Sequence, residues 1–317
     1  MVKIAIAGGS GPVAREIIDA LVATGKHDIT ILSRREASNN DVIPGTAWRK
    51  VDYSNHSALV EALKGTHTLL SFVQLMRESG QDSQKQLIDA AVAAGVKRFA
   101  PSEYGSSGTA HMSWYAGKEV AREYLRKLNA NGKVLEYTLF QPGLFLDYLA
   151  SPFQTSKYIT PLDTIFNYES CQAIVIDGYE DITITLTSAA DTAAIIAKAI
   201  DYDGEWPEIS GIQGNRATLS EIIKLGEKIR GRPFTVEKVK LEALKSGNVN
   251  LAWRFEKRHS AISEEEAQYM SKQVVIGILL SSFEGGWDVS GELNQMFPDY
   301  KFTTMEDFLS KVWSGKS

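Results

Sequence analysis

Residues 2–14 read VKIAIAGGSGPVA, a short apolar run that leads through a glycine-rich turn into a helix-forming stretch. Gly8 and Gly11 stand where a tight turn needs them, and Ala14 is small enough for close packing of helix and strand. This arrangement lets backbone N–H groups approach a pyrophosphate at the positive end of the helix. It favours dinucleotide binding over a simple strand-to-helix turn. The predicted cofactor contacts are Gly8, Gly9, Ser10, Gly11, Pro12 and Val13.

The first half of the chain alternates short apolar runs with amphipathic stretches that end at glycine. This rhythm predicts a doubly wound α/β fold with a parallel, Rossmann-like sheet. Strands are expected at 2–7, 28–33, 47–51, 68–73, 97–100 and 135–140. Past residue 143 the rhythm loosens, and the stretch AIVIDGYEDITITL at 173–186 predicts a hairpin. We expect a cofactor-binding domain over 1–150 and a smaller substrate-binding lobe over 151–317, partly interleaved with it.

The composition excludes several function classes. The formal net charge of −5 argues against broad binding to nucleic acid, which needs a basic face. Cys171 is the only cysteine, and the five histidines lack metal-ligand spacing, so we expect a reducing setting and no metal. The apolar run 274–283 is too short to span a membrane and predicts a buried helix. We expect a cytoplasmic protein with a small-molecule substrate and no membrane partner; a homodimer is compatible with the sequence.

The second expected strand ends in ILSRREAS, which bears on the choice of cofactor. Ser33, Arg34 and Arg35 occupy the place where NAD-binding proteins carry a carboxylate. Guanidinium groups match phosphate geometry, so NADP(H) is favoured over NAD(H), although a solvated basic turn is the plainer alternative. Asp52 and Tyr53, after the third strand, are candidates to border the adenine. The end of the fourth strand supplies candidate contacts on the nicotinamide side, which are as readily ordinary strand-end residues: Ser71, Phe72, Val73 and Gln74.

The stretch SWYAGKEVAREYLRK at 113–127 places Tyr115 and Lys118 three residues apart. Short-chain dehydrogenases usually place a catalytic tyrosine four residues before a lysine, so the spacing does not match. Both side chains still fall on one side of a helix and are able to border one pocket. The plainer interpretation makes Lys118 a solvated charge, with Glu119 and Arg122 also at the surface. The core face of that helix would be Val120, Ala121, Tyr124 and Leu128.

The chain resembles the NmrA-like and isoflavone reductase-like group of atypical short-chain dehydrogenases. The resemblance rests on an ordered series of motifs: GGSG, SRR, PSEYG, YAGKEVAREYL and TLFQPGLFLDYL. Within that group the chain looks most similar to the fungal oxidoreductases, which often belong to secondary metabolism. The resemblance implies that a single lysine early in this helix, Lys118, is the catalytic group and contacts the cofactor. It also implies that no tyrosine partner is required; Tyr115 stays a candidate beside it. Pro142 and Gly143 are further candidate cofactor contacts.

Aromatic residues suggest an apolar wall for a planar or aromatic substrate, although such residues are more often ordinary core. The candidate substrate contacts are Tyr104, Trp114, Phe145, Tyr148, Leu149, Phe153 and Trp253. The leading hypothesis is an NADPH-dependent reductase that transfers a hydride to a small, largely apolar or aromatic carbonyl, enone or imine. One alternative is an NmrA-type regulator that senses dinucleotides without catalysis. Another is a redox-neutral epimerase or cyclase on the same fold. The sequence leaves the substrate and the stereochemistry open.

Overall fold

The computed structural model describes residues 1–38, 41–76, 78–249, 251 and 264–316. Its main sheet has six parallel strands in the order β3-β2-β1-β4-β5-β6. The order changes direction between β1 and β4, and ligands of doubly wound sheets bind at that switch point. The expected doubly wound parallel sheet is confirmed. The strands are β1 Lys3–Ala7, β2 Asp28–Ser33, β3 Thr46–Lys50, β4 Thr68–Ser71, β5 Arg98–Ala100 and β6 Glu136–Tyr137.

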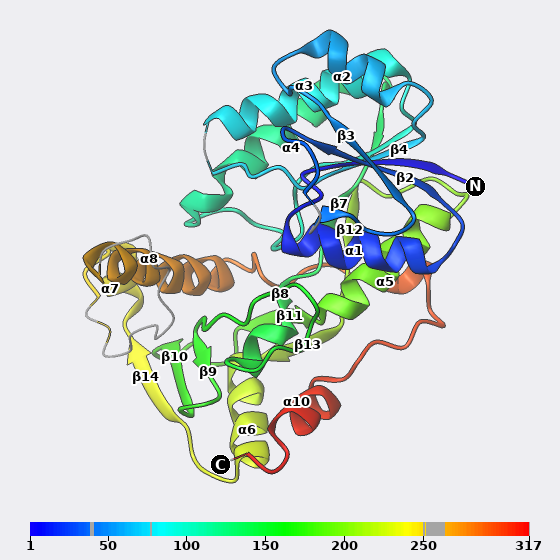
Figure 1. Ribbon diagram of the computed structural model, residues 1–317. Coiled ribbons are helices and arrows are strands. Elements are labelled where there is room, and N and C mark those ends of the chain that lie inside the picture. Colours follow the sequence, from blue (N-terminus) through cyan, green and yellow to red (C-terminus); the bar gives the residue numbers. More distant parts are fainter. Residues whose placement is uncertain (39–40, 77, 250, 252–263, 317) are drawn as a thin grey trace.

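Helices cover both faces of this sheet (Figure 1). On one face lie α1 Pro12–Ala23 and α5 Ala189–Asp201; on the other lie α2 His56–Leu63, α3 Glu78–Ala94 and α4 Ala116–Leu128. The strand β1 is buried on both sides, because Ile4 and Ile6 pack with α1 and α5 whereas Ala5 and Ala7 pack with α2 and α3. Side chains alternate along a strand, so a continuous apolar run suits a strand between two helical layers.

The last expected strand, 135–140, divides in two. β6 joins the main sheet, whereas β7 Leu139–Gln141 pairs with β12 Ile209–Gly211. Both β12 and α5 come from beyond residue 150, yet α5 packs against α1 of the first domain. The chain therefore returns to the first half of the fold after it has entered the second lobe.

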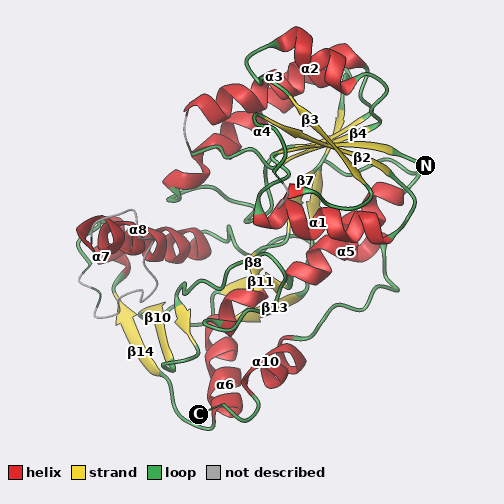
Figure 2. Cartoon of the chain, in the orientation of Figure 1, coloured by secondary structure: helices red, strands yellow, loops and turns green. Residues whose placement is uncertain are grey.

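The second lobe holds two small sheets, with orders β14-β10-β9 and β13-β11-β8 (Figure 2). The predicted hairpin at 173–186 is wrong: β10 pairs with β9 and β14, and β11 pairs with β8 and β13. Six residues separate β10 from β11, too many for a tight two-residue turn, and Asp177 N donates to Val239 O instead. The strands are β8 Leu144–Phe145, β9 Phe166–Asn167, β10 Gln172–Ile176, β11 Thr183–Thr187, β13 Asn215–Thr218 and β14 Thr235–Val239.

The helices of the second half are α6 Leu219–Arg230, α7 Leu241–Lys245, α8 Glu264–Phe283, α9 Glu292–Met296 and α10 Met305–Trp313. Among the described residues, η2 Ser113–Tyr115 and η3 Leu146–Ala150 are short 3-10 helices. The apolar run 274–283 forms the end of α8 and is largely buried, as predicted. None of the helices in the described part of the chain has the length and apolar character needed to cross a membrane.

Candidate active site

The turn between β1 and α1 has the backbone form that an anion-binding loop requires. Gly8 has φ of 77°, and a Cβ there would lie 2.8 Å from the carbonyl carbon and oxygen of Phe72, so only glycine fits. Gly11 N donates to Gly8 O at 3.2 Å and closes the turn. α1 begins at Pro12 with no side-chain cap and no acidic residue in its first turn. Its first backbone N–H groups and positive end are therefore available to a phosphate.

The two arginines after β2 differ in whether they are paired. Arg35 binds Asp41 through two hydrogen bonds of 2.5 and 2.7 Å and lies 5.5 Å above the Trp48 ring. This pair holds the pKa of Asp41 well below its usual range. Arg34 is exposed, and within the described part of the chain it has no ion-pair partner. Arg34 is therefore the guanidinium that is open to a bound phosphate, a distinction that the sequence did not make.

The other strand-end candidates support the loop or lie at its edge. Tyr53 is buried and its hydroxyl donates to Leu32 O at 2.9 Å, while burial raises its pKa to about 12. Asp52 accepts hydrogen bonds from Ser54, which lower its pKa. Ser71 donates to the buried Gln84 at 2.9 Å. Phe72 is half-buried beside Gly8, Val73 is buried, and Gln74 is exposed.

Lys118 is buried, with only 7% of its surface exposed. Its ammonium donates to the backbone carbonyl of Glu103, in the turn that follows β5, and lies 3.6 Å from the centre of the Tyr115 ring. A Cβ on Gly105 would lie 2.8 Å from Tyr115 Oη and 3.2 Å from Lys118 Nζ, so glycine leaves the space in which these two groups meet. The structure thus brings Tyr115 and Lys118 together despite their unusual spacing.

Burial lowers the pKa of Lys118 from 10.5 to about 8; the Glu103 carboxylate opposes this shift and Arg122 adds to it. Burial raises the pKa of Tyr115 further above 10. Lys118 is thus the more readily titrated proton donor of the two near neutral pH, because its pKa lies closer to the working range.

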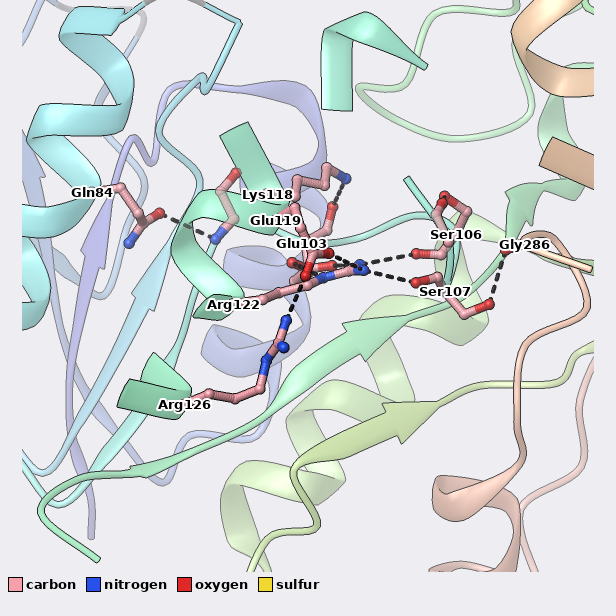
Figure 3. Close-up of polar contacts among 11 residues, drawn as sticks. Gln84, Glu103, Ser106, Ser107, Lys118, Glu119, Arg122, Arg126 and Gly286 are labelled. Carbon is pink, nitrogen blue, oxygen red and sulfur yellow. Dashed lines mark hydrogen bonds and ion pairs between the residues drawn. The ribbon is translucent and has the colours of Figure 1, made fainter. Parts of the chain in front are cut away.

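Arg122 lies in the core of this site, so its expected surface position is wrong. Its guanidinium forms a two-pronged ion pair with Glu103, with distances of 3.0 and 2.6 Å, and both side chains are almost fully buried (Figure 3). The expected core face is also wrong at Val120, which is 52% exposed. The buried face of α4 instead carries Gly117, Lys118, Ala121, Arg122 and Leu125.

Tyr104, Pro142 and Gly143 line the junction of the two halves of the chain. Tyr104 is buried, and its ring stacks on Phe72 with centres 4.3 Å apart. Gly143 N donates to Gly105 O at 3.1 Å, directly after Pro142. Gly143 has φ of 73°, and a Cβ there would lie 2.4 Å from the carbonyl oxygen of Thr185.

The substrate candidates divide into two groups. Trp114 lies edge-on to Tyr115 with ring centres 6.0 Å apart, and Phe145 lies edge-on to Tyr148 at 5.8 Å. Tyr148 is close enough to Tyr115 to affect its pKa.

Leu149 and Phe153 instead contribute to the packing of the second lobe. Leu149 is fully buried, and Phe153 packs edge-on against Trp313 at 5.1 Å. Trp253 lies outside the described residues. Among the described residues, no group of three or more histidine, cysteine, aspartate or glutamate side chains is placed to hold a metal ion.

Residues 2–309, nearly the whole chain, match the family described as NmrA-like. The chain belongs to the NmrA-like family. Its relatives include fungal oxidoreductases and plant isoflavone reductase homologues, so the resemblance read from the motifs is confirmed.

The chain is 27% identical over 344 aligned residues to oxidoreductase swnN of Metarhizium robertsii, an alignment that covers 100% of this chain and 98% of the relative. It is 29% identical over 311 residues to oxidoreductase BOA1 of Botryotinia fuckeliana, covering 94% and 95%. Among solved structures, one described as AtPrR2 with NADP+ and (+)pinoresinol matches with a TM-score of 0.71 and 18% identity, covering 98% of both chains. That likeness establishes the shared fold.

Proposed function

We propose that the protein is an NADPH-dependent reductase that transfers a hydride to a small, largely apolar or aromatic carbonyl, enone or imine. The observation that carries the proposal is the buried Lys118 ammonium, held between the Glu103 carbonyl and the Tyr115 ring. A protein that only senses dinucleotides has no chemical need for such a group. The fungal relatives described as oxidoreductases support the same reaction class.

The residues around the glycine turn fit a dinucleotide phosphate. Gly8 admits no side chain, and the first turn of α1 carries no acidic residue that would repel a pyrophosphate. Arg34 suits the 2′-phosphate that distinguishes NADPH from NADH, because Arg35 is already paired with Asp41. When bound, NADPH supplies the hydride. The related structure described with NADP+ supports this choice of cofactor.

The chemical role of Lys118 follows from its charge and its pKa. With a pKa of about 8, it is mostly an ammonium at pH 7 and is able to stabilise negative charge that develops on a substrate oxygen or nitrogen. It is also able to give up its proton more readily than an exposed lysine. Tyr115 keeps its proton over the same range and provides the ring face on which the ammonium rests.

Aromatic side chains beside Lys118 favour an apolar or planar substrate. Trp114 and Trp287 both contact the Tyr115 ring, with centres 6.0 and 6.4 Å away. Tyr148 and Phe145 approach from η3 and β8. Aromatic faces bind planar ligands by burial and stacking, with few directional requirements. This surrounding supports a substrate recognised by shape and apolar contact.

The test is a titration of NADPH and NADH into the wild type, Lys118→Met and the control Lys127→Met, whose lysine is exposed on the same helix. Binding is followed by cofactor fluorescence and turnover by NADPH oxidation over a panel of enones, ketones and imines. The proposal predicts that all three proteins bind NADPH and that only Lys118→Met turns over poorly. If the wild type binds NADPH but oxidises none, and Lys118→Met behaves identically, the reductase assignment is overturned in favour of a sensor or a redox-neutral enzyme.

A further inference from the structure

Arg122 uses every donor that its guanidinium has. Nε and Nη2 donate to the two carboxylate oxygens of Glu103. Nη1 donates to Ser107 O at 2.7 Å and to Glu119 at 3.4 Å, and Nη2 also donates to Ser106 O at 3.3 Å. A buried arginine with all its donors paired is held in one orientation, because any rotation would leave donors unsatisfied.

Through these bonds Arg122 holds residues 103–107 of the turn that follows β5. Glu103 lies near the start of this turn, and Ser106 and Ser107 lie near its middle (Figure 3). Ser107 in turn donates to Gly286 O through its backbone N at 2.9 Å and its hydroxyl at 3.0 Å. The residue that follows Gly286 is Trp287, whose ring lies beside Tyr115. The ion pair therefore holds the turn against the second lobe as well.

The same turn places the partner of the buried ammonium. Lys118 donates to the backbone carbonyl of Glu103, whose carboxylate is clamped by Arg122. Lys118 and Arg122 stand four apart, on one face of α4, so both reach the same residue of the turn. Glu103 thus binds one cation with its backbone and the other with its side chain.

The charges that face Lys118 come from a few elements. The turn after β5 contributes the Glu103 carboxylate, and α4 contributes Arg122. The neutral hydroxyls of Tyr115 and, beyond it, Tyr148 approach from η2 and η3. Tyr104 lies next to Glu103. The two full charges have opposite signs and opposite effects on the lysine.

We propose that Glu103 and Arg122 act as a positioning pair that fixes the place of the Lys118 ammonium and balances the charge around it. The proposal rests on the proposed function, in which Lys118 assists hydride transfer. Neither member of the pair needs to touch the substrate. Removal of either charge leaves the other unopposed beside the lysine, so the two removals act in opposite directions.

The experiment compares Arg122→Met and Glu103→Gln in the full-length protein, each of which removes one charge and keeps similar bulk. The pH profile of NADPH oxidation in the wild type falls through a midpoint near the Lys118 pKa of about 8. Arg122→Met leaves the Glu103 carboxylate unpaired and raises this midpoint by about one pH unit, whereas Glu103→Gln lowers it by about one unit. The double variant returns toward the wild-type midpoint.

Two controls separate charge from structure. Arg126→Met removes a pair with Glu119 on the exposed side of α4 and leaves the midpoint unchanged. Arg122→Lys keeps the positive charge but loses the two-pronged pairing with Glu103. The midpoint of its pH profile therefore stays close to that of the wild type, while its maximal rate falls. If Arg122→Met does not fold, Glu103→Gln and Arg122→Lys still provide the test. Shifts of equal sign in the two single variants, or no shift in Glu103→Gln, overturn the proposal.

A second readout needs no turnover. Acetic anhydride acetylates only the neutral amine, so the pH dependence of the Lys118 acetylation rate, followed by mass spectrometry, gives the midpoint of its titration in each variant. The same opposite shifts are expected in this labelling curve. If the labelling curves shift as expected and no protein oxidises NADPH, the proposed function fails and the positioning role of Glu103 and Arg122 stands. If NADPH is oxidised and the labelling curves coincide, only the positioning role fails.

Discussion

Replacement of Lys118 by Met is expected to stabilise the folded protein at neutral pH. Burial lowers the pKa of this lysine from 10.5 to about 8, which at 1.36 kcal/mol per unit corresponds to a cost of about 3 kcal/mol for keeping it charged in the folded state. Met does not donate to Glu103 O, and it also loses the contact of the ammonium with the Tyr115 face. These losses offset roughly half of the gain. The net expected stabilisation is about 1 to 2 kcal/mol.

The dependence on pH distinguishes this cause from a general packing effect. Because the folded-state pKa of Lys118 is below its unfolded value, the unfolded chain binds more protons between about pH 8 and 10.5. The wild type therefore gains stability relative to Lys118→Met as the pH rises through that window. Urea titrations at pH 7, 8.5 and 10 measure the gap. A variant that is less stable than the wild type at pH 7, or a gap that stays constant with pH, would refute the reasoning.

Three further changes test other parts of the site. Arg34→Gln is expected to weaken NADPH binding about tenfold and leave NADH binding unchanged. Arg35→Gln is expected to lower the free energy of unfolding and to change the ratio of NADPH to NADH affinity less than Arg34→Gln does. Tyr115→Phe keeps the ring face under the buried lysine and most of the activity, whereas Tyr115→Leu lowers the midpoint of the pH–rate profile by about one unit. Gly143→Ala costs more than about 2 kcal/mol in a denaturant titration, whereas Gly178→Ala, with a similar φ but open space around it, costs about 1.

Each of these expectations has a contrary outcome. Equal losses of NADPH and NADH affinity in Arg34→Gln would show that this arginine does not read the 2′-phosphate. Loss of turnover in Tyr115→Phe, with cofactor binding intact, would make the hydroxyl the proton donor. Similar denaturation midpoints for the two glycine variants would mean that the close approach to Thr185 relaxes at little cost.

The sequence predicts best what depends on local pattern. The glycine turn and the apolar strand β1 before it follow from neighbouring residues, and the structure has both. The hairpin at 173–186 failed because the choice of partner strand is not local: two apolar runs joined by a turn look like a hairpin whichever strands they pair with. The break between β6 and β7 was missed for the same reason.

Arg122 was missed because charged residues are usually exposed, and its partner lies nineteen residues earlier in the chain. One signal was present: Lys118 and Arg122 are four residues apart, so if one is buried at the turn after β5, the other faces the same turn. A carboxylate in that turn, Glu103, then becomes the expected partner. The difference between the paired Arg35 and Arg34, which is unpaired among the described residues, had no such signal, because nothing in the local sequence pattern assigns Asp41 to one arginine or the other.

The return of α5 and β12 to the first half of the fold limits how the protein can be recombined with its relatives. A chimera joined at residue 150 would carry away the helix that packs on α1 and the strand that pairs with β7. The foreign segment would then have to complete the packing of another protein's first half before its own lobe could be held in place. Exchange of the second lobe between relatives therefore requires several junctions, placed on either side of residues 189–211.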